Sequence, residues 1–208
     1  MACYLILHGL GGSTGGHWQE RLAADLASQG HRVLFPAFPQ ADDPDRTQWL
    51  KCLNEVITKV ENKAELIVVA HSLGCTLWLH YAAQRTRVKV RQAILVSPPA
   101  SSLEENVLSL LFKDERKRRK AFESMKTFFP LPDSKEILRK AAVHSLIIGS
   151  SDDPFLPGDS FLRYSSYQVP MLYLPNMGHI NVASGYGPWH WMQKFCQELA
   201  SKIADPAQ

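Results

Sequence analysis

The chain has 208 residues, of which 45% are hydrophobic and 21% are charged, and its formal net charge is +3. This composition excludes an intrinsically disordered chain, and the length predicts one domain spanning residues 1–208. No apolar run approaches the roughly 20 residues that a membrane-spanning helix needs, so we expect no membrane span.

The chain starts without the basic stretch and cleavage site that mark a signal peptide, and it enters an apolar run almost at once. Its four cysteines lack the pairing typical of zinc sites or disulfide frameworks: Cys3, Cys52, Cys75 and Cys196. We therefore expect a cytoplasmic protein that needs no metal and no cofactor.

Six short apolar runs alternate with amphipathic helix patterns, which predicts an α/β fold with a parallel sheet and helices on both faces. The expected strands are 3–7, 32–35, 65–70, 92–97, 145–149 and 170–174. Only two residues precede the first run, too few for an additional hairpin. We predict a minimal six-stranded sheet in the order 2-1-3-4-5-6, with right-handed crossovers.

A glycine-rich turn, His8-Gly9-Leu10-Gly11-Gly12, follows the first expected strand. It contains neither the lysine of a phosphate-binding P-loop nor a G-x-G-x-x-G pattern. Glycines such as Gly9 and Gly11 let the backbone approach a substrate closely, and the N–H of Leu10 is a candidate donor to an oxyanion. His17 follows the turn and is a candidate substrate contact, whereas Trp18 belongs to a core-facing stripe of the next helix.

Ser72 lies in Ala70-His71-Ser72-Leu73-Gly74, between the apolar run of the third expected strand and a helix pattern. A sharp strand-to-helix turn of this kind exposes a nucleophilic serine, and small residues two positions before and after it relieve crowding. Glycine is usual at both positions, so Ala70 is a departure. The alternative is an ordinary helix-capping serine. If Ser72 is a nucleophile, the backbone N–H of Leu73 is a second candidate oxyanion donor.

The segment 98–142 follows the fourth expected strand and is a candidate cap insertion. It carries two short amphipathic stripes, which either form a small helical cap over a substrate or pack on the sheet edge. The first consists of Leu103, Val107, Leu110 and Leu111, and the second of Phe122, Met125, Phe128 and Phe129. Residues 113–120 include six basic and two acidic side chains. Because aromatic interleaving is absent, we interpret this run as a solvated helix face and expect no nucleic-acid partner.

The last two expected strands each end in residues that can support a serine nucleophile. Asp152 and Asp153 follow the fifth strand, and Gly178-His179 follows the sixth. A serine needs a histidine to accept its proton, and the histidine needs a carboxylate to fix its tautomer. The order serine, acid, histidine is the order found in α/β-hydrolases, and all of these loops emerge at the carboxyl ends of the strands.

The spacing of the His8-Gly9 turn, His17-Trp18, the turn at Ser72, Asp152-Asp153-Pro154 and Gly178-His179 resembles the small serine hydrolases typified by retinoblastoma-binding protein nine and bacterial YdeN. The resemblance covers nearly the whole chain. It implies a compact α/β-hydrolase fold with Ser72 as nucleophile, Asp153 as acid and His179 as base.

These observations together predict a serine hydrolase that cleaves a small ester through an acyl-enzyme. An amidase or aminopeptidase with the same three residues is an alternative, and so is a protein that binds a partner protein on a hydrolase scaffold. The expected ligand is a small acyl compound.

Overall fold

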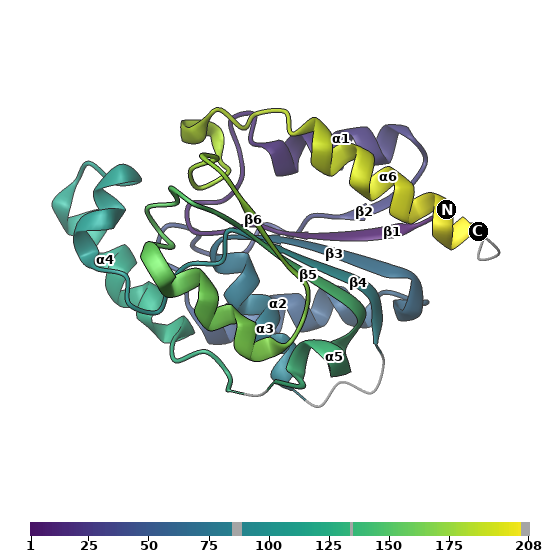
Figure 1. The fold of residues 1–208 in the computed structure, drawn as a ribbon, viewed down its shortest axis with the longest axis horizontal. Coiled ribbons are helices and arrows are strands. Elements are labelled where there is room, and N and C mark those ends of the chain that lie inside the picture. The colour runs from purple at the N-terminus through teal and green to yellow at the C-terminus, as the bar shows by residue number, and fades with distance from the viewer. Residues whose placement is uncertain (85–88, 134, 205–208) are drawn as a thin grey trace.

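The computed structural model describes residues 1–84, 89–133 and 135–204. Across these ranges, six strands form one sheet in the order β2-β1-β3-β4-β5-β6, and every neighbouring pair is parallel (Figure 1). The strands are β1 (Cys3–Leu7), β2 (Arg32–Leu34), β3 (Leu66–His71), β4 (Val90–Val96), β5 (Ala142–Ser150) and β6 (Met171–Leu174). The predicted fold class and strand order are confirmed.

Helices cover both faces of the sheet. The α-helices are α1 (Trp18–Ser28), α2 (Arg46–Thr58), α3 (Leu73–Ala83), α4 (Glu115–Met125), α5 (Ile137–Ala141) and α6 (His190–Ala204). Short 3-10 helices are η1 (Lys63–Glu65), η2 (Glu105–Leu110), η3 (Lys126–Phe128), η4 (Gly158–Tyr167) and η5 (Val182–Ser184). Helices α1 and α6 lie on one face, and α2, α3 and α5 lie on the other (Figure 1).

Successive side chains along a strand point to opposite faces of the sheet, so the core consists of two layers, one on each face. In β1, Leu5 and Leu7 pack with the layer of α2 and α3, whereas Tyr4 and Ile6 pack with that of α1 and α6. All six residues of β3 are buried, as expected of a central parallel strand covered on both faces. The apolar runs of the sequence therefore specify the sheet.

The predicted stripe on α2 forms part of this core. Trp49 is fully buried, its indole N–H donates to the Pro39 carbonyl at 2.8 Å, and its ring stacks on Phe38 at 4.8 Å between centroids. Leu53 and Ile57 are buried one and two turns further on. The apolar stripe of α2 thus packs this helix onto the sheet.

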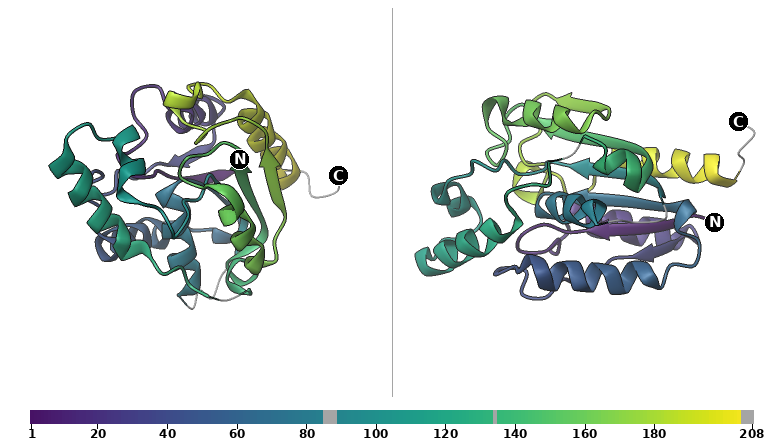
Figure 2. Two further views of the ribbon diagram at one scale, coloured as in Figure 1. Left: turned by 60° about the vertical axis from the view of Figure 1, so that its left-hand side comes forward. Right: turned by 90° about the horizontal axis from the view of Figure 1, so that it is seen from below.

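The segment 98–142 has two parts, which pack in different places. Near its start, Leu108 and Ala121 pack against Phe155 in a small separate cluster, so η2 and α4 project from the carboxyl end of the sheet (Figure 2). Further on, Phe128 is fully buried in the main core, and α5 with the first residue of β5 completes the body of the fold. Of the first amphipathic stripe, Val107 packs against this separate cluster, whereas Met125, Phe128 and Phe129 of the second pack in the main core.

The basic run 113–120 lies on and just before α4, and most of its side chains are exposed. Arg118 Nε lies 3.6 Å from a Glu105 carboxylate oxygen, and Lys120 Nζ lies 2.6 Å from Asp43 Oδ2. These pairs connect α4 to η2 and to the loop before α2. Among the described residues, no helix is both long and apolar enough to cross a bilayer.

Replacing Trp49 with alanine should lower the free energy of unfolding by about 3–5 kcal/mol, because a buried indole is lost and a cavity remains. Trp191, which is 43% exposed, provides the matched control. Urea denaturation of W49A and W191A should show a much smaller loss for W191A. Equal losses would contradict the burial assigned to α2.

Candidate active site

Ser72 lies at the junction of β3 and α3, on the turn that the sequence predicts. Its backbone angles are φ 52° and ψ −125°, a left-handed conformation that is rare for residues other than glycine. The Ser72 N–H donates to the Val96 carbonyl at 2.9 Å, which ties the turn to β4. Although Ser72 occupies the position before α3, its side chain does not cap the helix. The hydroxyl is therefore available for another partner.

Two glycines allow the turn at Ser72 to approach the end of β1. A Cβ at Gly74 would lie 2.5 Å from the Leu7 carbonyl oxygen and 2.7 Å from that of His8, both of them backbone atoms. A Cβ at Gly9 would lie 2.7 Å from the Ser72 Cβ. Ala70 is fully buried in the core, where its methyl group is accommodated. The elbow thus requires glycine after the serine but not before it.

Ser72, His179 and Asp153 form a continuous chain of contacts. His179 Nδ1 lies 2.9 Å from both Asp153 carboxylate oxygens, and its Nε2 lies 2.9 Å from Ser72 Oγ. Because a carboxylate only accepts, the ring carries its proton on Nδ1, and Nε2 is free to accept the serine proton. Both side chains of the His–Asp pair are almost completely buried, and the Phe155 ring packs on His179 at 4.4 Å between centroids.

The side chains of the neighbouring acids Asp152 and Asp153 have different partners. The Asp153 side chain faces the His179 ring, and its Oδ1 also accepts the Phe155 N–H at 2.9 Å. The Asp152 side chain turns elsewhere and accepts the Ser150 hydroxyl and the Gly178 N–H, each at 2.7 Å. These two hydrogen bonds lower the pKa of Asp152.

The loop that carries His179 is fastened to the end of β5. Ser150 Oγ accepts the Met177 N–H at 2.8 Å, and Ser151 Oγ accepts the Asn176 N–H at 3.0 Å. Together with Asp152, three consecutive polar residues thus hold three consecutive backbone N–H groups. Neither Ser150 nor Ser151 is among the residues predicted from the sequence. Their signal is a run of short polar side chains directly after a buried strand.

The glycine-rich turn lies beside Ser72, as predicted. Gly11 N–H donates to the Ala41 carbonyl at 2.9 Å, and Gly12 N–H donates to that of Gly9 at 3.2 Å. Within the described part of the chain, the Leu10 N–H has no acceptor. Leu73 is the first residue of α3, where an N–H has no acceptor inside its own helix. Both predicted backbone donors are thus free of the turn and helix hydrogen bonds around them.

Two further histidines border the site. His71 Nε2 lies 2.9 Å from the His179 carbonyl and donates to it, as expected of a residue that shapes the turn. His17 caps α1, and its Nδ1 accepts the Gln19 N–H at 3.2 Å. Burial, with the neighbouring charges of His179 and His8, lowers the pKa of His17 to about 4. His17 is therefore neutral at neutral pH, with its proton on Nε2.

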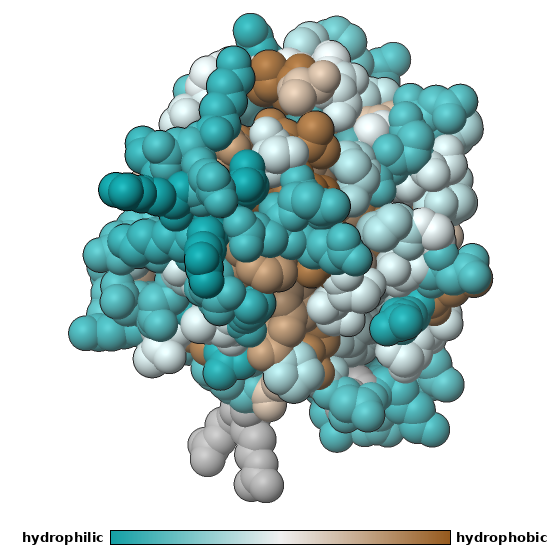
Figure 3. All heavy atoms as spheres, turned by 90° about the vertical axis from the view of Figure 1, so that its left-hand side faces the viewer, coloured by the Kyte–Doolittle hydropathy of each residue, from teal (hydrophilic) through white to brown (hydrophobic). Residues whose placement is uncertain are grey.

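A cavity of about 340 Å³ opens over Ser72 and His179 at the carboxyl end of the sheet. Its lining includes the turn Gly9–Gly12, His17, Asp42, Leu111, Phe112 and 181–183. Figure 3 views this end of the molecule and shows apolar side chains in a band between polar surfaces. Three exposed apolar side chains contribute to this end: Leu110, Leu111 and Val182. Phe112 and Val182 are pocket residues that were not predicted from the sequence.

No three His, Cys, Asp or Glu side chains converge as possible metal ligands in the described ranges. The groups gathered around the cavity instead form a serine, histidine and carboxylate series beside free backbone N–H groups. Such an arrangement can generate a nucleophile and stabilise an oxyanion.

Comparison with known proteins assigns the family. A family model described as serine hydrolase matches residues 4–198. The chain belongs to the serine hydrolase family. It is an enzyme of this family, as the resemblance in the sequence implied. A search of curated proteins by sequence found no match.

Solved structures share the fold of this serine hydrolase. The ydeN gene product of B. subtilis is 22% identical with a TM-score of 0.79, over 97% of this chain and 100% of that chain. A YdeN-like hydrolase from Pectobacterium atrosepticum is 17% identical with a TM-score of 0.70, over 96% and 90%. A carboxylesterase structure from Nitrososphaera gargenis is 16% identical with a TM-score of 0.67, over 98% and 92%. These likenesses establish the α/β-hydrolase fold.

Replacing Gly74 with alanine should reduce hydrolysis of an activated short-chain ester about a hundredfold, because the new methyl group displaces the elbow from β1. Replacing Ala70 with glycine is the control. It should retain the rate while lowering the free energy of unfolding by about 1–2 kcal/mol, through a lost buried methyl group and greater chain entropy. A fully active G74A protein would show that the elbow does not need this contact.

Proposed function

We propose that this serine hydrolase cleaves a small ester through an acyl-enzyme, with Ser72 as nucleophile, His179 as general base and Asp153 as the acid that orients it. The observation that supports this assignment is the chain of 2.9 Å contacts from Asp153 through His179 to Ser72 Oγ. A serine hydroxyl within hydrogen-bond distance of a histidine nitrogen can transfer its proton to that nitrogen as it attacks.

The reaction proceeds in two halves. His179 Nε2 takes the Ser72 proton while Oγ bonds to the ester carbonyl carbon, and the resulting imidazolium gives that proton to the departing alcohol. Water then attacks the acyl-enzyme, His179 accepts a proton from it, and Ser72 leaves with the proton returned. Asp153 stays ionised and stabilises the imidazolium in both halves.

The oxyanion formed in each half is held by the backbone N–H groups of Leu10 and Leu73. Both belong to segments whose positions are fixed before substrate arrives, one by the turn after β1 and the other by the start of α3. Donors that do not reorganise are the most effective at this task. Gly9 and Gly11 leave the approach to Leu10 free of side chains.

The cavity favours a small acyl compound with an apolar group. Leu111, Phe112 and Val182 provide apolar walls, and we assign η2 with α4 as the cap that supplies the first two. The Nε2–H of His17 has no hydrogen-bond partner among the described residues, so it can donate to a polar atom of the substrate. These features suit a small acyl substrate that has an apolar group and a polar acceptor atom.

Ser72→Ala should abolish hydrolysis of an activated short-chain ester and leave the thermal unfolding temperature nearly unchanged, because only one hydroxyl is removed. A fluorophosphonate probe, which labels activated serines, should modify the wild-type protein at Ser72 and not the variant. Wild-type turnover in S72A would refute the nucleophile. A folded protein that is inert to both ester and probe would favour partner binding on a hydrolase scaffold.

Asp153→Asn should lower kcat for the same ester by about 10⁴-fold, because the amide favours the wrong imidazole tautomer. Asp152→Asn is the matched neighbour, since it bonds the loop backbone and not the ring. We expect D152N to retain most of the activity. Steady-state kinetics of both variants decide the assignment, and a larger loss in D152N would reverse it.

A further inference from the structure

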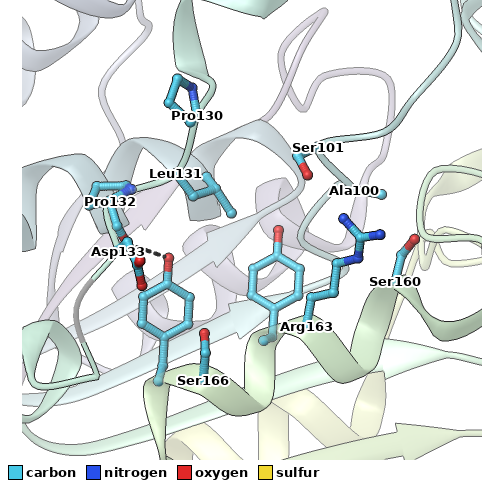
Figure 4. Close-up of a pocket in the computed structure, with 11 residues that line it drawn as sticks. Ala100, Ser101, Pro130, Leu131, Pro132, Asp133, Ser160, Arg163 and Ser166 are labelled. Atoms are coloured by element: carbon cyan, nitrogen blue, oxygen red, sulfur yellow. Dashed lines mark hydrogen bonds between the residues drawn. The ribbon is translucent and has the colours of Figure 1, made fainter.

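A second cavity, of about 530 Å³, lies apart from the catalytic pocket and shares no lining residue with it. Three segments form it: residues 100–101 after β4, residues 130–133, and the helix η4 (Figure 4). The proposed catalytic mechanism uses none of these residues. The cavity is thus a separate feature of the molecule whose polar groups need their own explanation.

One side of the cavity presents converging hydrogen-bond donors. In Figure 4 the Arg163 guanidinium lies between the side chains of Ser101 and Ser160. Within the described ranges, Arg163 forms no ion pair and neither hydroxyl forms a hydrogen bond. A planar guanidinium flanked by hydroxyl donors matches the two oxygens of a carboxylate.

The remaining wall is apolar and fixed. Tyr164 donates its hydroxyl to the Pro99 carbonyl at 2.7 Å, and Tyr167 donates to that of Pro132 at 3.0 Å. Because these hydroxyls are already paired, the tyrosines offer their rings to the cavity. Leu131 projects into it between the two ends (Figure 4). A ligand here therefore contacts a short hydrocarbon surface.

The opposite side carries one acid. Asp133 lies across the cavity from Arg163 (Figure 4). Burial, with the negative charge of Asp133, raises the pKa of Tyr167 to about 12. Asp133 therefore acts on groups inside this cavity, and it disfavours a second anion at its end while favouring a cation.

We infer that this cavity binds a small ω-amino carboxylate, with the carboxylate on Arg163, the hydrocarbon body on Leu131 and the ammonium group on Asp133. Neither charge alone selects such a molecule. The pair, separated by an apolar surface, favours a molecule with both charges over a simple fatty acid or a simple amine. The inference does not depend on the proposed reaction, because no residue is common to both sites.

Binding is measured by titration calorimetry on the S72A protein, so that turnover does not interfere. The probes are 6-aminohexanoate, hexanoate and hexylamine. We expect 6-aminohexanoate to bind most tightly. Arg163→Gln should weaken both carboxylates about fivefold, as expected for a partly solvated ion pair. Asp133→Asn should remove the advantage of 6-aminohexanoate over hexanoate.

Arg116→Gln on α4 is the control, because Arg116 is also exposed and lies outside this cavity. Equal weakening in R116Q and R163Q, or equal affinities for the three probes, would overturn the inference. Ester hydrolysis by R163Q in the Ser72 background should equal that of the wild type. Loss of probe binding with normal hydrolysis therefore bears on this cavity alone, whereas loss of hydrolysis in S72A bears on the catalytic proposal alone.

Discussion

The close approach of the elbow to the end of β1 is the constraint on which the rest of the site depends. Space for a side chain is absent both at Gly74, against the carbonyls of Leu7 and His8, and at Gly9, against Ser72. Leu10, whose N–H we propose as an oxyanion donor, lines the same cavity as Ser72. The close approach holds Ser72 in a left-handed conformation that an isolated turn would relax. Ser72, which we propose as the nucleophile, is therefore positioned by backbone packing and not by a side-chain hydrogen bond to the helix it precedes.

The adjacent acids Asp152 and Asp153 have different structural roles. One carboxylate must meet an imidazole ring at hydrogen-bond distance, and the loop bearing that ring must be held still. Asp153 contacts the ring, while Asp152 binds the backbone of Gly178, one residue before His179. Both residues lie in the turn after β5, where their side chains face different partners, so one short turn can do both. Ser150 and Ser151 extend the same anchoring to the preceding loop residues.

The sequence predicts the sheet well because its central strands carry apolar runs, as in β3, where all six residues are buried. The order of Ser72, the acid pair and His179 likewise locates the site, since all parallel strands end at one edge. Which acid faces the ring is different, because it depends on the turn between Ser150 and Asp153, which residue types do not encode. The segment 98–142 is similar. The stripes predict the burial of Phe128, but not that Leu110 and Leu111 stay exposed or that Leu108, which belongs to neither stripe, is buried beyond the sheet.

The buried histidines explain how one ring can carry the charge in a crowded site. The His71 ring contacts the rings of both His17 and His179. Its centroid lies 4.9 Å from that of His17 and 5.0 Å from that of His179. Two imidazolium ions at such a distance would repel by about 3 kcal/mol at an effective dielectric constant of about 20. Burial lowers the pKa of both His17 and His71, so these rings stay neutral at neutral pH. Within this cluster His179 is the ring that has a carboxylate on its Nδ1, and in the proposed mechanism that carboxylate stabilises the proton taken from Ser72.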